Sequence, residues 1–396
     1  MKAELDHILA ENGADALLLY SDSKKDANMY YVSNFLAPDP FIYLKRVDSP
    51  AVIVVSQMEY LRAQKQAAVK DVKSVQDYDY LKVVQSAKDP QLGSIKFIAN
   101  VAKQELGKDA KICVPPTFPV MVADVLRGEG LTVVPMFDVV EKARETKDPK
   151  EVQAIKQIQK VNEQVTGEVI DLIAGCDVGA NKVLLCNGEP LTVGMVKAVF
   201  GTKFIQNGCL PEEDIIVSCG PKSSDPHYVG EPGDKLKADQ PIILDVYPWS
   251  IQKCYWTDMT RTVVKGKASA KVWKMFEAVQ EAKNVSMDGI HAGANASQVY
   301  GLCCDVLERN GFETTRGGRR VTVGMTHTLG HGVGLQIHES PRLGEFSDFG
   351  LREHCVVTVE PGVYDPKTGG MRLEDIIEVT KGGYNNLTQM QTILEI

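Results

Sequence analysis

Residues 326–342 read THTLGHGVGLQIHESPR and place three histidines, His327, His331 and His338, among three glycines. Glycine permits sharp backbone turns and a close approach of the main chain to another group. The stretch can therefore bring several imidazole rings near a small ligand. It is the first candidate for a functional site in this chain.

Two largely apolar segments follow this stretch, and each contains a glutamate that is a candidate site residue. CVVTVEPGVY at 355–364 contains Glu360, and MRLEDIIEV at 371–379 contains Glu374. Burial of an ionised carboxylate is unfavourable unless the group is paired, hydrogen bonded or bound to a metal. We therefore expect both glutamates to have a partner of this kind.

Two further acids lie upstream. Asp245 ends the apolar run PIILD, and Asp258 lies in the next predicted strand, CYWTDMTRTVV, so that both can face one cavity. Together with His331, Glu360 and Glu374 they give four carboxylates and one imidazole. Like charges at such close range stay ionised only when cations neutralise them, and hard oxygen ligands with one nitrogen suit Mn, Co, Fe or Zn. The set therefore predicts two divalent metal ions, an arrangement known in aminopeptidases.

Composition excludes several classes of protein. The chain has 396 residues, 44% of them hydrophobic and 24% charged, and a length of this kind predicts two domains. A formal net charge of −8 without a basic patch argues against nucleic acid as a partner. No apolar run approaches the roughly 20 residues that span a bilayer, and the N-terminus lacks a secretory signal pattern. We therefore expect a cytoplasmic protein with no membrane partner.

The cysteines do not predict a structural site. There are nine of them, an odd number at irregular spacing, and no C-x-x-C pair occurs. Neither a disulfide framework nor a thiolate zinc site is indicated.

The first part of the chain, residues 1–146, alternates short apolar runs with amphipathic stretches, which is typical of an α/β domain with a mixed sheet. No catalytic constellation occurs in it. The aromatic and proline-rich segment at 29–41 is predicted to be a loop. The predicted strands are DALLLYS from 15, AVIVVS from 51, KFIANV from 96, KICVPP from 111 and LTVVPM from 131.

The second part, residues 147–396, starts with a long predicted helix that ends near Gly175. Asp148 is its candidate N-cap and Pro149 occupies the first helical position. We assign no firm structure to residues 176–210, where a helix would be interrupted by glycines. The remainder is predicted to be α+β, with helices at 268–287 and 297–310 and later strands at 355–364, 373–380 and 390–395.

The motifs together resemble a known family. The order DVYPW, CYWTDMTRT, GHGVGLQIHESPRL, TVEPGVY and GGMRLED is similar to that of the pita-bread metallopeptidases, specifically the Xaa-Pro branch with prolidases and aminopeptidase P. The resemblance implies a C-terminal pita-bread catalytic domain at 147–396. It also implies a smaller creatinase-like α/β domain at 1–146, and members of this branch are often homodimers.

The resemblance implies a role for each metal ligand. Asp245 would hold one metal, Asp258 and Glu374 would bridge both, and His331 and Glu360 would complete the other site. The implied reaction is hydrolysis of the bond before proline by a metal-bridged hydroxide. The substrate would be a proline-containing dipeptide or oligopeptide, for an Xaa-Pro dipeptidase or an Xaa-Pro aminopeptidase.

Further residues match positions that contact the substrate in this family. His227 and His338 would bind the substrate and stabilise the tetrahedral intermediate, and Arg342 would hold the substrate carboxylate. Glu360 would take the proton from water and pass it to the leaving nitrogen.

Two alternatives on the same fold stay open. A creatinase-like hydrolase works without metal, and a non-catalytic binding protein normally lacks the metal ligands, so the five ligands present here disfavour both. A zincin helix is disfavoured because His327 and His331 are not part of an HExxH motif, and we expect His327 to be structural. The segment between Asp245 and Asp258 is longer than usual in the family, which affects the expected shape of the pocket rim.

Overall fold

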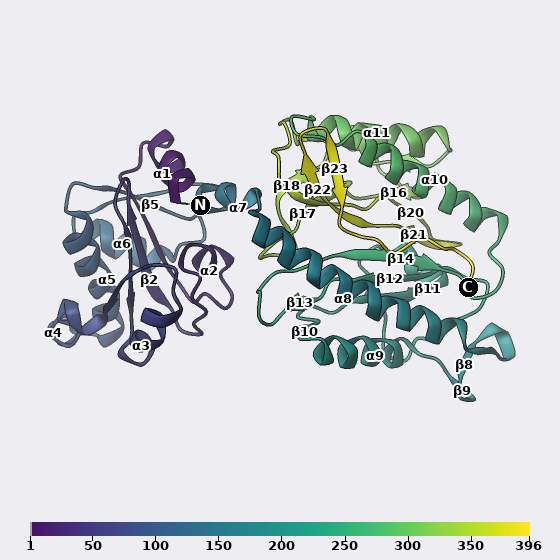
Figure 1. Ribbon diagram of the computed structural model, residues 1–396, viewed down its shortest axis with the longest axis horizontal. Helices are drawn as coiled ribbons and strands as arrows, with labels where there is room; N and C mark the ends of the chain where they lie inside the picture. The colour runs from purple at the N-terminus through teal and green to yellow at the C-terminus, as the bar shows by residue number, and fades with distance from the viewer. Residues whose placement is uncertain (1) are drawn as a thin grey trace. The chain divides into compact units, whose positions relative to one another are not determined.

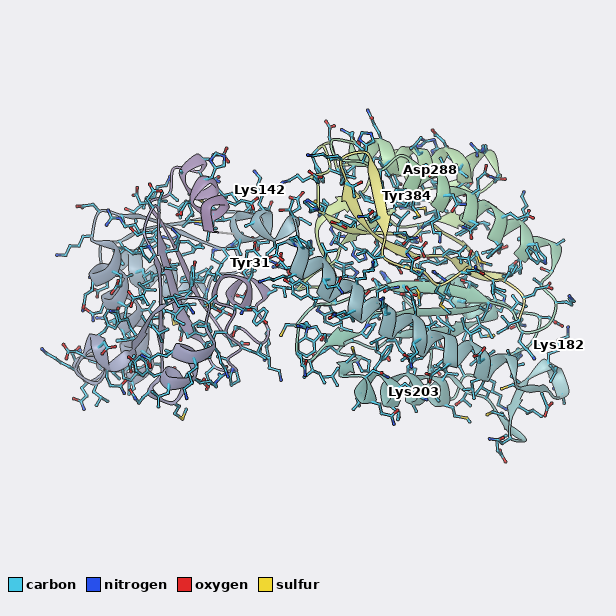
Figure 2. All side chains as sticks on the ribbon, viewed as in Figure 1. Tyr31, Lys142, Lys182, Lys203, Asp288 and Tyr384 are labelled. Carbon is cyan, nitrogen blue, oxygen red and sulfur yellow. The ribbon has the colours of Figure 1, made fainter. Side chains whose placement is uncertain are left out.

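The computed structural model describes residues 2–396, and the chain divides into two compact units between Arg144 and Glu145. In each unit the helices flank the strands (Figure 1). Side chains fill the space between these elements (Figure 2). Among the described residues, no helix is both long enough and apolar enough to span a bilayer.

The first unit is built on one six-stranded sheet. Its strands are β1 (Ala16–Ser21), β2 (Phe41–Arg46), β3 (Ala51–Val55), β4 (Asp71–Ser74), β5 (Lys111–Val114) and β6 (Thr132–Pro135). Its helices are α1 (Lys2–Glu11), α2 (Ala27–Ser33), α3 (Gln57–Gln66), α4 (Tyr80–Ser86), α5 (Pro90–Leu106), α6 (Val120–Gly128) and α7 (Val139–Glu145). The strand order is β4-β3-β2-β1-β5-β6. Strands β1 to β3 are antiparallel and the other pairings are parallel, which is the mixed sheet that the sequence predicts.

Two predictions for this unit are wrong. Residues 96–101 are not a strand but part of α5, which is capped by the Asp89 side chain and starts with a proline. Phe97, Ile98 and Val101 are buried at helical spacing, and a short apolar run does not distinguish a buried helix from a strand. The segment 29–41 is not a single loop either, since it begins inside α2 and ends in β2.

The second unit contains more and shorter elements. Its helices are α8 (Pro149–Ala174), α9 (Val193–Gln206), α10 (Ala270–Asp288) and α11 (Ala296–Arg309). Its first strands are β7 (Asp177–Val178), β8 (Leu184–Cys186), β9 (Glu189–Pro190), β10 (Cys209–Leu210), β11 (Ile216–Cys219), β12 (Ile242–Val246), β13 (Trp249–Ser250) and β14 (Met259–Val263). The later strands are β15 (Glu313–Thr314), β16 (Gly324–Met325), β17 (Gly330–Gly332), β18 (Glu339–Leu343), β19 (Val356–Val359), β20 (Gly362–Asp365), β21 (Gly369–Arg372), β22 (Asp375–Thr380) and β23 (Gly383–Asn386).

The strands of the second unit form several sheets between two pairs of helices. The larger sheets have the orders β11-β12-β14, β15-β16-β20-β21 and β18-β17-β19-β22-β23. Helices α8 and α9 share one apolar core with β11 and β12, whereas α10 and α11 share another with β19, β21 and β22. The observed architecture is α+β, as the sequence predicts.

Three predictions for this unit can be compared with its helices and strands. Helix α8 begins at the predicted N-cap, where the Asp148 side chain accepts hydrogen bonds from the backbone N–H groups of Lys150 and Glu151. Helix α9 is continuous through both of its glycines. The expected strand at 390–395 is not formed, because that segment makes only an isolated bridge between Val264 and Glu395.

Candidate active site

The five predicted ligands lie around one pocket of about 680 Å³ in the second unit. Asp245 is in β12 and Asp258 comes directly before β14. These two strands pair in antiparallel fashion with Asp245 opposite Thr260, so both acids reach the same end of the sheet. His331 lies in β17, next to this end in the pocket lining.

Glu360 and Glu374 reach the pocket from breaks between strands. The predicted strand at 355–364 is interrupted at Glu360 and Pro361, which separate β19 from β20. Glu374 occupies the corresponding break between β21 and β22. At such a break a carboxylate can leave the sheet surface and point into the pocket instead of the apolar core.

Three of the five residues form a tight cluster. Asp258, His331 and Glu374 each offer one ligand atom, and these atoms lie within 4.8 Å of one another. His331 Nε2 is 3.7 Å from Asp258 Oδ2 and 3.3 Å from Glu360 Oε1. Asp245 lines the same pocket but its Oδ2 accepts a 2.6 Å hydrogen bond from Arg372.

Two oxygen atoms in this cluster fit a divalent metal. Asp258 Oδ1 and Glu374 Oε1 are buried and have no hydrogen-bond partner among the described residues. Burial and repulsion between the neighbouring carboxylates raise the pKa of both Asp258 and Glu374 well above their ordinary values. Unpaired buried carboxylate oxygens are costly, and hard divalent cations bind such atoms. The donor set therefore fits the metal ions that the sequence predicts.

The His331 ring is oriented for a metal at Nε2. Its Nδ1 is 3.1 Å from the carbonyl oxygen of Gly332 and is placed to donate a hydrogen bond to it, so that Nε2 points toward the acids, where it can bind a metal or, in the metal-free protein, donate to Glu360. The backbone N–H of His331 donates to Thr358 Oγ1 at 3.0 Å. Gly330 allows this packing, because a Cβ there would lie 2.1 Å from the carbonyl oxygen of Thr358.

Other side chains fix the carboxylates. Thr260 Oγ1 donates to Glu374 Oε2 at 2.8 Å, and Thr358 Oγ1 donates to Glu360 Oε1 at 3.4 Å. Burial would raise the pKa of Glu360, but its hydrogen bond and charge interaction with His331 outweigh burial and hold that pKa at about 2. Glu360 is therefore ionised at neutral pH.

Arg372 and Tyr364 form a second polar layer beside the cluster. Arg372 donates to Asp245 and also to the Tyr364 hydroxyl at 2.7 Å. His327 Nε2 lies 2.8 Å from the same hydroxyl, and His327 lines the pocket. A role for Tyr364 is not predictable from the sequence, because an aromatic residue at the end of an apolar run is typical of a buried strand.

The three predicted substrate residues also line the pocket. His227, His338 and Arg342 are exposed there, and the His338 and His331 rings lie 4.3 Å apart at nearly a right angle. Burial and the neighbouring His331 lower the pKa of His338 to about 4, so this imidazole is neutral at pH 7. Arg342 lies in β18, directly opposite His331.

The rim of the pocket contains residues that the sequence analysis missed. Tyr247 comes from the long segment between Asp245 and Asp258, and its hydroxyl donates to the carbonyl oxygen of Asp214 at 2.7 Å. Glu213 and Asp214 lie beside it in the lining. The unusual length of the segment between Asp245 and Asp258 was the only sequence feature that indicated a contribution of this segment to the rim.

Comparison with known families gives two matches that cover most of the chain. Residues 153–381 match the model of metallopeptidase family M24, and residues 2–146 match the model of the creatinase/prolidase N-terminal domain.

Relatives and solved structures agree with these matches. An Xaa-Pro dipeptidase of Pyrococcus horikoshii is 26% identical over 96% of this chain and 94% of its own. The Xaa-Pro dipeptidase of Pyrococcus furiosus is 30% identical over 64% of this chain and 72% of its own. The structure of the Xaa-Pro dipeptidase from Bacillus anthracis superposes with a TM-score of 0.81 at 25% identity, covering 100% of this chain and 98% of the other.

Proposed function

Because the chain belongs to metallopeptidase family M24, we propose that its pocket is the active site of an Xaa-Pro peptidase. The family confirms the expected fold, a creatinase-like N-terminal domain followed by a pita-bread domain. The chain is thus a metallopeptidase. We further propose residues 1–146 and 147–396 as the bounds of the two domains.

One observation carries the proposal for the site. Asp258 Oδ1 and Glu374 Oε1 are buried without a hydrogen-bond partner among the described residues, beside an imidazole whose Nε2 faces them. We propose that Asp258, His331 and Glu374 hold divalent metal, and that Asp245 and Glu360 complete a two-metal site. Mn, Co, Zn and Fe are the candidate ions.

Bound divalent metals supply a more acidic water and polarise the scissile carbonyl. The chain itself supplies Glu360, which is ionised at neutral pH and can accept a proton from water and return it to the leaving nitrogen. His227 and His338 face the same pocket, and imidazole N–H groups there can donate to the developing oxyanion.

Recognition of proline follows from its chemistry. A proline nitrogen in a peptide bond carries no hydrogen, so the pocket cannot recognise it by accepting a hydrogen bond from that nitrogen. The pocket must instead hold the proline ring by contact with apolar atoms. Ile216, Val229 and Ile337 provide apolar lining in this pocket. Arg342 offers a positive charge for the substrate carboxylate.

We propose an Xaa-Pro dipeptidase, or prolidase, ahead of an Xaa-Pro aminopeptidase, because relatives that cover much of this chain carry the former name. The test compares a dipeptide ending in proline with a tripeptide that has proline second, using metal-stripped protein and protein supplied with Mn, Co, Zn or Fe.

Metal-dependent cleavage of the dipeptide alone is the expected result. Cleavage of the tripeptide would identify an aminopeptidase instead. If neither peptide is cleaved with any metal, the creatinase-like or binding alternative replaces the peptidase proposal. The homodimer stays a prediction, for which light scattering is the check, as does the cytoplasmic location.

A further inference from the structure

Helix α8 carries a row of polar side chains that is buried completely. Gln159, Asn162 and Thr166 have 0% exposure and lie three and four residues apart, on one face of the helix. Apolar residues such as Ile158 and Val165 make up the rest of the buried surface of α8. Buried polar groups destabilise a protein unless they are hydrogen bonded, so this row requires partners.

The partners of Gln159 lie on both sides of Asp258. Its Oε1 accepts a hydrogen bond from the Thr257 hydroxyl, and its Nε2 lies 3.5 Å from the sulfur of Met259. Thr257 and Met259 are the two chain neighbours of Asp258 and both have 0% exposure. The Gln159 carboxamide therefore contacts the side chains on both sides of Asp258 and restricts the position of the Asp258 backbone.

The same carboxamide also connects to the segment that carries Glu374. Gln159 Nε2 donates to Thr388 Oγ1 at 3.1 Å, and the same oxygen accepts the backbone N–H of Ile376 at 3.0 Å. Ile376 lies two residues after Glu374. One side chain of α8 thus links the segments of Asp258 and Glu374, which contribute the two unpaired buried oxygens.

The next member of the row reaches a third ligand. Asn162 Nδ2 donates to the carbonyl oxygen of Val246 at 2.7 Å, and Val246 directly follows Asp245. Thr166 differs from the other two, because its hydroxyl donates to Asn162 Oδ1 within the same helix. Helix α8 lies across β12 and β14, where these contacts are made (Figure 1).

We infer that Gln159 and Asn162 are positioning residues for the metal site, which set the spacing of the Asp245, Asp258 and Glu374 carboxylates. The inference rests on the proposed function. The two residues line no part of the pocket, so their effect would pass through the backbone next to the ligands. Groups that are hydrogen bonded directly to metal ligands typically change metal affinity by roughly 10- to 100-fold, and we expect the same range for these residues, which contact the chain neighbours of the ligands.

The test measures Co²⁺ binding by the metal-stripped full-length protein. Gln159→Met keeps the length of the side chain and removes its hydrogen bonds, and Thr257→Val removes one of those bonds from the side of Asp258. We expect each variant to raise the Kd for Co²⁺ by roughly 10- to 100-fold and to alter the visible absorption of bound Co²⁺. With the proline dipeptide, kcat should fall while KM changes little.

Ser286→Ala is the matched control. It removes a hydroxyl that is buried as completely as Gln159, but this hydroxyl donates to the carbonyl oxygen of Ala282 within α10. We expect it to lower the unfolding temperature while the Co²⁺ Kd and spectrum stay at wild-type values. Circular dichroism of every variant separates loss of fold from loss of metal.

The double variant Gln159→Met/Thr257→Val tests the route. If Gln159 acts through Thr257, the Kd of the double variant for Co²⁺ will be about equal to the larger of the two single-variant Kd values. The reason is that both changes remove the same hydrogen bond, between Thr257 and Gln159. Wild-type Kd and spectrum in folded Gln159→Met and Thr257→Val proteins would overturn the inference, as would an equal loss of metal affinity in Ser286→Ala. If the wild-type protein itself binds no divalent metal, the proposed function fails first, and this inference falls with it.

Discussion

The ionised carboxylate of Asp258 is unfavourable in its buried position until a metal ion or a proton neutralises its charge. It is 4% exposed, its Oδ1 has no partner in the part of the chain described, and burial together with the neighbouring carboxylates raises its pKa. The nearby Arg261 does not neutralise it, because Arg261 is buried and paired with Asp375. The group therefore destabilises the metal-free protein and stabilises the metal-bound one.

The substitution Asp258→Asn tests whether burial of this carboxylate is unfavourable in the metal-free protein. The amide keeps the size of the side chain but relieves the repulsion, so we expect the unfolding temperature of the metal-free protein to stay level or rise. Stabilisation by added metal, about 2.7 kcal/mol at a hundredfold excess over Kd for the wild-type protein, should disappear together with peptidase activity. Thermal unfolding with and without Mn²⁺ is the measurement, and full activity in this variant would show that the ligand assignment is wrong.

Arg342→Ala addresses the substrate end of the site. Arg342 is exposed in the pocket lining, and a hydrogen bond to a charged group contributes about 1.5 kcal/mol at the low end of the usual range. We expect KM for a proline dipeptide to rise roughly tenfold on that basis, and KM for a tripeptide to rise less, because its carboxylate lies one residue further on.

Steady-state kinetics on both peptides makes the comparison. Arg320→Ala, at an exposed arginine outside the pocket, is the control and should leave both KM values unchanged. Equal increases for the two peptides would remove the carboxylate role from Arg342.

At the scale of elements, the tight pairing of β17 with its neighbours fixes His331. A Cβ at Gly330 would lie 2.1 Å from the Thr358 carbonyl oxygen, so Gly330→Ala must push β17 away from β19. We expect a destabilisation of roughly 1–3 kcal/mol and weaker metal binding, because the hydrogen bond from His331 N–H to Thr358 is strained at the same time.

Gly201→Ala is the opposite case. Gly201 lies inside α9 with open space around its Cβ position, so alanine there should stabilise the protein by about 0.5–1 kcal/mol. Chemical unfolding of both variants and a metal titration provide the test. A Gly330→Ala protein with wild-type stability would mean that β17 can move without cost.

The elements also show what a sequence can predict. Helix α8 is predictable because its cap is local chemistry, with Asp148 and Pro149 adjacent to the first turn. The structure of residues 96–101 is not predictable in this way, since their apolar side chains suit a strand as well as a buried helix. Only packing in the first unit decides between helix and strand.

The candidate site shows the same division. Glu360 and Glu374 are conspicuous as acids in apolar runs, and the structure brings both to one pocket. Gln159, Thr260 and Tyr364 are ordinary residues in sequence. Gln159 and Thr260 form hydrogen bonds with partners about 100 or more residues away in the sequence. Tyr364 contacts the Arg372 and His327 side chains. Only the fold brings these partners together.

At the scale of the whole molecule, each unit has apolar clusters of its own. One cluster of the first unit consists of residues between 16 and 133, whereas three clusters of the second unit consist of residues from 155 onward. All residues that line the pocket belong to the second unit. Metal binding therefore stabilises one unit by direct contact and leaves the other without a ligand.

Scanning calorimetry of metal-free and metal-loaded protein tests this separation. Because a multidomain chain need not unfold in one step, we expect two transitions, and only that of the second unit should move upward with metal. A shift of about 2–4 °C per kcal/mol is typical of a domain of this size. Gly201→Ala should move the same transition as metal does, which identifies it. If both transitions rose equally with metal, the two units would be coupled in unfolding, and stabilisation at the pocket would extend to the whole chain.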